Sequence, residues 1–253
     1  MRAASSAPPL TSPARGKPAF TRLQSPPPLP ALVHPRSPVP GGKSGTGFFV
    51  AEDGSLLTAA HVVTGCSRVQ ILSSLVPLLP AAVVARDMAH DVALLRVPQM
   101  HPPAVLPLAR KPLPNHPLLV LGYPASAGPT NAAEAVASLQ NQKLPSYVGS
   151  MADPREVVWI QSAPVTHGYS GGPIVDTRSG AVVGLVKAMV EGDFLRRIDG
   201  MPANGMAIGP STTRLKSFLQ REAPQLDRMP DNGTREDATT TARRATVHVL
   251  CWP

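Results

Sequence analysis

The sequence predicts an all-β protein of the sandwich or barrel kind. Short runs of β-branched and apolar residues alternate with Gly, Pro, Asp and Asn along most of the chain, which is typical of short strands joined by turns. Only residues 211–222 place apolar side chains at helical spacing. The 253 residues are 43% hydrophobic and 16% charged, as in globular domains. No repeat with a period of roughly 20–50 residues is visible, so a propeller or solenoid is not expected.

The first predicted hairpin joins residues 45–50 to residues 55–58. Its turn contains Asp53-Gly54, a dipeptide typical of tight hairpin turns. Further strands are predicted at 68–72, 81–86, 91–97, 117–122, 157–161, 173–176, 181–187 and 206–208. A helix at 211–222 follows, with Ser211 as its N-cap. Many strands and one terminal helix fit a β-barrel protein.

Three segments differ from the body of the chain in composition. Residues 1–40 hold 11 of the 31 prolines, five basic residues and no Asp or Glu, so we expect a disordered, basic leader. Residues 223–253 hold four basic and four acidic residues and are expected to form a disordered tail. Residues 98–117 contain seven prolines and are predicted to link two halves of the body, residues 41–222.

The net charge of +8 does not indicate a nucleic-acid partner. The leader alone carries five positive charges and no negative ones, and the basic pairs in the body lack interleaved aromatic residues. The first 33 residues contain no continuous apolar run, so no secretory signal is expected, and the most apolar stretch, residues 71–85, is too interrupted to span a membrane. The sequence alone points to the cytoplasm, although a leader rich in Arg and Ser also fits an organelle transit peptide.

The two cysteines, Cys66 and Cys251, are predicted to be free thiols. One of them lies in the expected tail, and disulfide frameworks belong mainly to small exported domains. No Cys or His pair has the spacing of metal ligands, apart from His61 and Cys66, which stand alone. No metal and no cofactor are therefore expected.

Three motifs hold the residue types of nucleophilic catalysis. They are Thr58-Ala59-Ala60-His61, then His90-Asp91 before an apolar run, then Gly168-Tyr169-Ser170-Gly171-Gly172. A serine hydroxyl is a poor nucleophile at neutral pH, so it needs a histidine to accept its proton and a carboxylate to fix the tautomer of that histidine. It also needs amides directed at the oxyanion, which Gly168 can supply because it has no side chain. His90, beside Asp91, is predicted to be structural or exposed.

These motifs resemble those of the trypsin-like serine peptidases of the chymotrypsin fold, and most closely those of the HtrA (Deg) branch. The similar segments are SGTGFFVAEDGSLLTAAHVV (44–63), DVALLRV (91–97), GYSGGPIVD (168–176), SGAVVGLV (179–186) and GMAIGPSTTRLKSFL (205–219). The resemblance implies two perpendicular six-stranded antiparallel β-barrels, at about residues 43–98 and 117–222, with the active site between them. It also implies a polypeptide substrate, and it makes a trimer and a periplasmic, exported or organellar location possible. The 31 residues after the helix are too few for a PDZ module, so none is expected.

By the same resemblance, His61 is the general base, Asp91 orients it and Ser170 forms the acyl-enzyme. The amides of Gly168 and Ser170 form the oxyanion hole. The implied specificity pocket comprises Pro164, Val165, Thr166, Val186, Lys187, Ala188, Gly205, Met206 and Ala207. This set contains no acid, so we expect cleavage after aliphatic residues, although Lys187 would favour an acidic residue if it reached into the pocket.

Other interpretations remain open. Tyr169 stands where the family usually has Asn or Asp, and His167 precedes the oxyanion glycine, so a latent or inactive module that binds peptides on the same fold is the main alternative. A third hypothesis makes the proline-rich leader a ligand for partner domains. The nucleophile elbow of α/β-hydrolases also matches the Gly-x-Ser-x-Gly pattern, but Gly171-Gly172-Pro173 would break the helix which that elbow requires.

Overall fold

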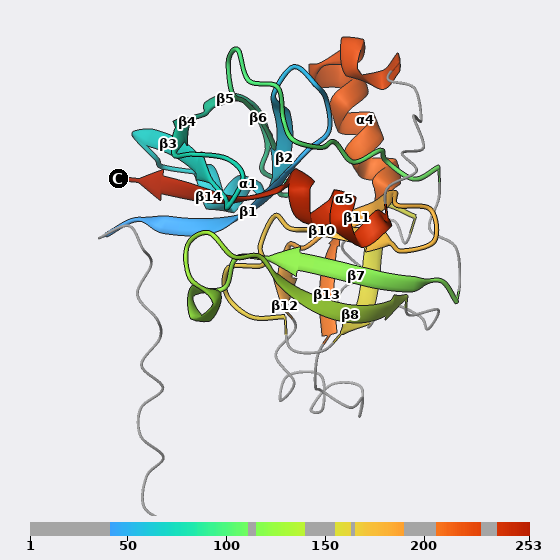
Figure 1. Cartoon of the computed structure of the whole chain (residues 1–253). Coiled ribbons are helices and arrows are strands. Elements are labelled where there is room, and N and C mark those ends of the chain that lie inside the picture. Colours follow the sequence, from blue (N-terminus) through green and yellow to red (C-terminus); the bar gives the residue numbers. More distant parts are fainter. Residues whose placement is uncertain (1–40, 111–114, 140–154, 163–164, 190–205, 229–236) are drawn as a thin grey trace, which may run out of the picture. The chain divides into compact units, whose positions relative to one another are not determined.

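The structure is a computed structural model and describes residues 41–110, 115–139, 155–162, 165–189, 206–228 and 237–253. Two antiparallel sheets dominate it (Figure 1). The predicted leader, residues 1–40, lies outside the described residues. No helix among the described residues is long and apolar enough to cross a membrane.

The first sheet closes into a six-stranded barrel. Its strands are β1 (Lys43–Phe49), β2 (Ser55–Thr58), β3 (Arg68–Leu72), β4 (Leu79–Pro80), β5 (Ala82–Asp87), β6 (Val92–Arg96) and β14 (Thr246–Trp252), in the order β4-β3-β14-β1-β2-β6-β5. Only Ala81 separates β4 from β5, so the two edges of the sheet are halves of one strand. The first half pairs with β3 and the second with β6, which leaves no free edge.

The second sheet closes in the same way. Its strands are β7 (Pro117–Gly122), β8 (Ala133–Leu139), β9 (Val157–Ser162), β10 (Pro173–Asp176), β11 (Val182–Leu185), β12 (Ala188–Met189) and β13 (Met206–Pro210), in the order β11-β10-β7-β8-β9-β13-β12. Two residues separate β11 from β12, and these halves pair with β10 and β13. The prediction of two six-stranded antiparallel barrels is therefore confirmed, but the range of about 43–98 predicted for the first barrel is wrong, because this barrel also contains β14.

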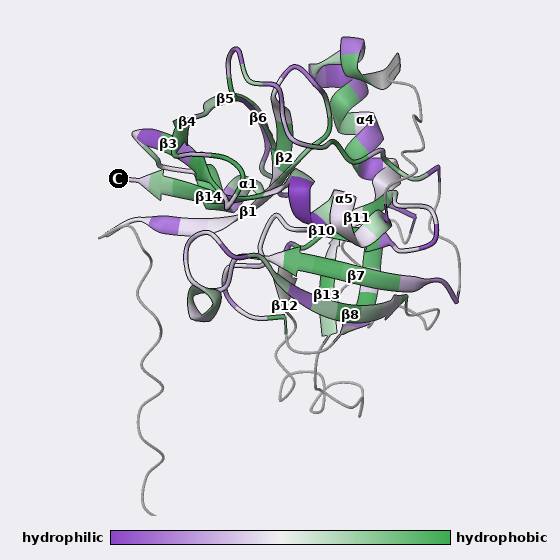
Figure 2. Cartoon of the chain, in the orientation of Figure 1, coloured by the Kyte–Doolittle hydropathy of each residue, from purple (hydrophilic) through white to green (hydrophobic). Residues whose placement is uncertain are grey.

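Strands buried on both faces explain why the sequence shows short apolar runs rather than strict alternation. All four residues of β2 and of β10 are buried, and β7 is hydrophobic along most of its length (Figure 2). The buried residues form two core clusters. One, around Phe48 and Leu57, extends from the first barrel to Leu121 of β7, and the other, around Val120 and Ile160, lies within the second barrel. The stretch predicted as a linker runs from β6 to β7, and its Leu106 is buried and donates its amide to the Phe49 carbonyl of the first barrel at 2.9 Å.

The helices are short, except for the one predicted from spacing. The described residues form α1 (Ala60–Val63), α4 (Thr212–Glu222) and α5 (Ala238–Ala245), with 3-10 turns at Ala125–Ala127 and Pro224–Arg228. Helix α4 matches the predicted helix and buries Leu215, Phe218 and Leu219. Ser211 does occupy its N-cap position, but its hydroxyl donates to the Arg155 carbonyl at 2.7 Å instead of capping the helix.

The prediction of a disordered tail is wrong for residues 238–252. Helix α5 presents Thr241, Ala242 and Ala245 to the interior, and Asp237 caps it by accepting a hydrogen bond from the Thr240 amide at 3.0 Å. Strand β14 then lies between β1 and β3, with six of its seven residues buried. Balanced charge over the whole segment concealed a seven-residue strand whose partners lie almost 200 positions earlier in the chain.

The prediction of free thiols is also wrong, because Cys66 and Cys251 form a disulfide with a Cα–Cα distance of 5.3 Å. Cys251 lies on β14 opposite Val69 of β3, and Cys66 lies two residues before β3. The strand pairing that the sequence did not reveal is what brings the two sulfur atoms together.

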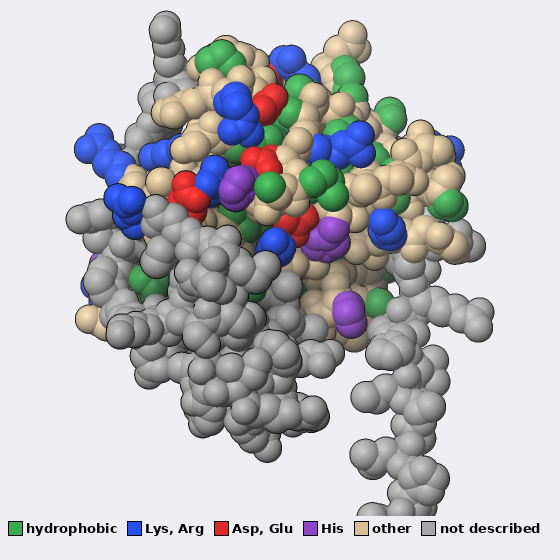
Figure 3. All heavy atoms as spheres, turned by 180° about the vertical axis from the view of Figure 1, so that it is seen from behind, with side chains coloured by type: hydrophobic (Ala, Val, Ile, Leu, Met, Phe, Trp, Pro, Cys, Tyr) green, Lys and Arg blue, Asp and Glu red, His purple; other side chains and the backbone are tan. Residues whose placement is uncertain are grey.

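Charges of both signs lie side by side on the surface. On the face shown in Figure 3, acidic side chains and histidines are interspersed with Lys and Arg. Ion pairs join Arg96 to Asp53 at 2.6 Å and Arg221 to Asp87 at 3.3 Å, and Arg243 to Glu134. This mixture agrees with the sequence, in which the leader carries +5 of the net charge of +8 and leaves only +3 for the other residues.

Candidate active site

His61 lies on α1, a single turn directly after β2. Val62 and Val63 are buried in the first core cluster and hold this turn against the barrel. The side chain of His61 points away from that core and is 47% exposed. The Thr-Ala-Ala-His motif therefore presents a histidine at the surface on a short helix with a buried face.

Asp91 holds His61 by two hydrogen bonds. Its carboxylate accepts one from the His61 amide and one from the His61 Nδ1, both at 2.8 Å. Because an ionised carboxylate only accepts, Nδ1 carries the proton and Nε2 is left as the basic nitrogen. Asp91 is buried and has a φ of +59°, a left-handed conformation that non-glycine residues rarely adopt and that tends to occur at functional sites.

The loop that carries Ser170 depends on glycines. Gly168 has a φ of +103° and Gly171 a φ of +84°. A Cβ at Gly168 would lie 2.3 Å from the Tyr123 carbonyl oxygen, and one at Gly171 would lie 2.2 Å from that of Thr46. Neither position could accept a larger residue without moving the backbone, so the glycines of this motif are required by the geometry.

Backbone contacts bring the Ser170 loop to the histidine. The Ser170 carbonyl accepts a hydrogen bond from the Thr46 amide at 2.8 Å. Gly45, the neighbour of Thr46, has no room for a Cβ because the Val62 side chain and the Ser170 carbonyl oxygen occupy that space. Ser170 is thus brought close to Val62, the residue that follows His61. Among the described residues, the Ser170 hydroxyl makes no hydrogen bond to His61.

The two predicted oxyanion donors are available. Within the described part of the chain, neither the Gly168 amide nor the Ser170 amide donates a hydrogen bond to another protein group. The neighbouring amides are engaged, since that of Tyr169 donates to the Thr166 carbonyl at 3.2 Å and that of Gly171 to the Val186 carbonyl at 2.7 Å. The loop therefore leaves unpaired the two amides that the resemblance assigns to the oxyanion.

The predicted pocket residues are described only in part. Val165, Val186, Met206 and Ala207 are buried, whereas Thr166 and Lys187 are exposed. Pro164 and Gly205 lie outside the described residues, as does the side chain of Ala188. Lys187 donates its amide to the Ile208 carbonyl of β13 at 2.9 Å. The backbone of the Val186–Lys187 segment is thereby fixed beside β13.

Tyr169 is a core residue and only 4% exposed. Its ring occupies the space in which a Cβ of Gly122 would lie, at 2.4 Å, and belongs to the second core cluster. Burial, with a smaller contribution from Glu134, raises the pKa of its hydroxyl. The unusual residue beside the candidate nucleophile therefore anchors the loop to the second barrel.

The described residues contain two further His-Asp pairs, so a His-Asp pair alone does not identify an active site. His90 donates its amide to Asp87 at 3.1 Å, and its Nδ1 lies 2.8 Å from the same carboxylate. Burial alone raises the pKa of Asp87, but the hydrogen bonds and charge of His90, together with Arg221, hold it below its usual value. His116 pairs with Asp176 at 2.7 Å. Only the His61-Asp91 pair adjoins the Ser170 loop, and sequence analysis missed the other two pairings.

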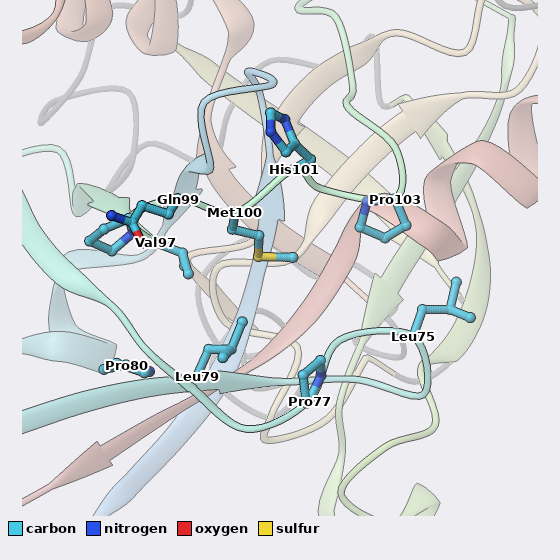
Figure 4. A pocket seen from close by; sticks show the side chains of 10 residues that line it. Leu75, Pro77, Leu79, Pro80, Val97, Gln99, Met100, His101 and Pro103 are labelled. Atoms are coloured by element: carbon cyan, nitrogen blue, oxygen red, sulfur yellow. The ribbon is translucent and has the colours of Figure 1, made fainter.

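The described residues contain no group of three His, Cys, Asp or Glu side chains that could hold a metal ion. A pocket on the first barrel is lined mainly by apolar residues, among them Leu79 and Met100 (Figure 4). None of the predicted site residues lines it.

Comparisons with known proteins agree with these observations. The family description "Trypsin-like peptidase domain" matches residues 45–185, which is more than half of the chain. The serine protease Rv3671c of Mycobacterium tuberculosis is 32% identical over 160 residues, which cover 62% of this chain and 40% of that protein. The mitochondrial serine protease HTRA2 of Bos taurus is 30% identical over 182 residues, which cover 70% of this chain and 36% of that protein. The matched region thus spans well under two thirds of these relatives.

Solved structures of the Rv3671c protease have a similar fold. The active form has a TM-score of 0.54 at 28% identity, covering 71% of this chain and 73% of that chain. The inactive form has a TM-score of 0.53 at 29% identity, covering 71% of this chain and 84% of that chain. Because both forms match equally well, the likeness does not distinguish an active arrangement from an inactive one.

Proposed function

Because the chain belongs to the family of trypsin-like peptidase domains, we propose that it is a serine endopeptidase with His61, Asp91 and Ser170 as its catalytic triad. The observation that carries this proposal is the double hydrogen bond from His61 to Asp91 beside the Ser170 loop. The bond at Nδ1 orients the imidazole ring. The bond that the His61 backbone amide donates to the same carboxylate holds Asp91 against the turn that carries the ring.

The proposed mechanism begins at His61 Nε2. This nitrogen accepts the proton of the Ser170 hydroxyl as the oxygen attacks the scissile carbonyl, and Asp91 stabilises the imidazolium that forms. The amides of Gly168 and Ser170 donate to the oxyanion. The protonated His61 then gives its proton to the leaving amine, and water releases the acyl group by the same steps in reverse. Catalytic hydrogen bonds often tighten only when substrate is bound, so a missing Ser170–His61 bond is compatible with this mechanism.

We propose exposed or unfolded polypeptides as substrates, with aliphatic residues on the acyl side of the scissile bond. Support comes from the composition of the segments assigned to the pocket, which carry no acidic residue at their described positions, 165–166, 186–188 and 206–207. The exposed side chain of Lys187 gives no support for an acidic preference. Selectivity among aliphatic residues should be modest, since one methylene contributes about 1–3 kcal/mol.

A latent peptide-binding module is the second candidate. The observation in its favour is the missing hydrogen bond between Ser170 and His61, together with the equal similarity to active and inactive forms of one relative. Such a module would bind unfolded chains through the same cleft but would not turn them over.

Digestion of unfolded, fluorescein-labelled casein distinguishes the two candidates. The wild-type protein should cleave it, and Ser170→Ala should lower turnover by about a million-fold, as expected for triads that act as a unit. Terminal sequencing of the fragments would test the aliphatic preference. Binding of casein with no cleavage above the Ser170→Ala background would instead support the latent module.

A further inference from the structure

Thr46 of β1 makes four hydrogen bonds at the point where the first barrel meets the Ser170 loop. Its amide donates to the Ser170 carbonyl at 2.8 Å, and its hydroxyl donates to the Gly168 carbonyl at 2.6 Å. The same hydroxyl accepts from the Tyr123 amide at 2.9 Å. The Thr46 carbonyl accepts from the Thr58 hydroxyl at 2.6 Å. Thr46 is 0% exposed, so water cannot replace any of these bonds.

The two bonds to the loop restrain the peptide units on either side of the candidate nucleophile. The Gly168 carbonyl belongs to the peptide that leads to Tyr169, and the Ser170 carbonyl to the peptide that leads to Gly171. Because each peptide is planar, anchoring both carbonyls limits rotation of the segment between them. That segment includes the Ser170 amide and directly follows the Gly168 amide, which are the two proposed oxyanion donors.

The hydroxyl also connects the loop to the second barrel. Tyr123 directly follows β7, and its carbonyl oxygen fills the space in which a Gly168 Cβ would lie. The amide of the same residue donates to the Thr46 hydroxyl. One buried hydroxyl therefore links β1, the end of β7 and the loop. Removing it would leave a buried N–H and a buried carbonyl without this partner.

We infer that Thr46 is a positioning residue, which holds the Gly168–Ser170 segment so that both amides can donate to the developing oxyanion. This inference rests on the proposed function. Thr46 does not contact the reacting atoms itself, so its effect must pass through Gly168 and Ser170. Oxyanion interactions strengthen in the transition state, so a loose loop should lower kcat far more than it weakens substrate binding.

The test uses the p-nitrophenyl ester of N-acetylvaline as substrate. Thr46→Val keeps the shape of the side chain but removes the hydroxyl, and we expect kcat to fall about ten- to a hundredfold while KM changes by less than about threefold. Thr46→Ser restores the hydroxyl and should stay within about threefold of wild-type kcat. The fluorophosphonate labelling rate of Ser170, which also passes through an oxyanion-like transition state, should follow the same order.

Thr212→Val is the matched control. Thr212 is also 0% exposed, and its hydroxyl makes one hydrogen bond, to the Ala109 carbonyl at 2.8 Å, away from the Ser170 loop. The Thr212→Val variant should have a lower melting temperature than wild type but the same kcat. Equal kcat for Thr46→Val and wild type would overturn the inference and leave the proposed function standing. No hydrolysis by wild type would overturn both.

The role of Thr46 can also be tested if the Thr46→Val variant does not fold. If Thr46→Val does not fold, Thr46→Ala, which removes the hydroxyl with less steric demand, is compared with Thr46→Ser at a temperature below both melting points. A kcat difference of about tenfold or more between these two supports the inference. If both variants without the hydroxyl are unfolded while Thr46→Ser is folded and active, Thr46 has a role in folding only and the inference is wrong.

Discussion

At the scale of single residues, Asp91 combines an unusual backbone conformation with the role proposed for it in catalysis. It adopts a strained backbone conformation, is buried, and accepts both the amide and the Nδ1 proton of His61. An asparagine at this position would keep the shape of the side chain. Its NH2 group would donate to His61 Nδ1, which leaves the imidazole proton on Nε2, so that Nε2 could not accept the proton of Ser170. Replacing Asp91 by asparagine therefore removes the negative charge while keeping the shape of the side chain.

We predict that Asp91→Asn lowers casein turnover by about four orders of magnitude while the protein remains folded. The matched control is Asp87→Asn, because Asp87 holds His90 with the same pair of contacts but lies outside the proposed triad. That variant should stay within a few-fold of wild type. Equal losses in the two variants, measured beside their circular dichroism spectra, would mean that Asp91 acts only through stability.

The scale of secondary-structure elements is where β14 matters most. This strand lies between β1 and β3 and completes the first barrel. Its residue His248 lies opposite Thr46 of β1 in the strand register. The His248 ring stacks on Tyr123 with centroids 5.1 Å apart, and its Nδ1 donates to the Pro129 carbonyl at 2.9 Å. The strand thus supports both the barrel and the residues that contact the Ser170 loop.

Because His248 is buried, we predict that the free energy of unfolding depends on pH. Burial lowers the pKa of His248 below its usual value of 6.5, although the hydrogen bond to Pro129 opposes the shift. The unfolded chain therefore binds a proton more readily than the folded one, and the free energy of unfolding should decrease as the pH falls below about 6.5. Above about pH 6.5, His248 should cause no further change in the free energy of unfolding with pH.

Urea unfolding between pH 5 and pH 7.5 measures this effect. His248→Phe keeps an aromatic ring against Tyr123 and should flatten the decline on the acid side. An unchanged slope in that variant would assign the acid sensitivity to other groups.

The disulfide between Cys66 and Cys251 gives a second prediction for β14. It joins residues 185 positions apart, so it restricts the unfolded chain strongly. Replacing both cysteines by serine should lower the free energy of unfolding by about 2–5 kcal/mol. Denaturation of wild type with and without dithiothreitol checks this, and the double variant should show no response to the reductant. Equal stability of reduced and oxidised wild type would contradict it.

At the scale of the whole molecule, the sequence revealed local features and missed distant ones. His61, Asp91 and Ser170 stand in short motifs with their own turn chemistry, so their surroundings could be predicted and the resemblance identified. The helix at α4 was evident from the spacing of Leu215 and its neighbours. These features depend on residues within a few positions of one another.

The missed features depend on pairing across the chain. Residues 246–252, TVHVLCW, have the composition of a strand, but nothing near them indicates that this strand pairs with β1, whose Ser44 lies opposite Leu250. The disulfide follows from the same pairing, and so does the burial of His248. Tyr169 stood out in the sequence only as a departure from the Asn or Asp that is usual in the family, because the glycine that accommodates its ring, Gly122, lies on β7. Sequence patterns alone carry no signal for such contacts.

The central claim is that His61 activates Ser170 as a nucleophile. It is tested most directly by treating the intact protein with a fluorophosphonate and mapping the adduct by mass spectrometry. We predict one adduct, on Ser170, which is absent in Ser170→Ala and forms at least about a thousandfold more slowly in His61→Ala. A wild-type protein that remains unlabelled in the presence of unfolded casein, or one that is labelled equally fast without His61, would contradict the claim.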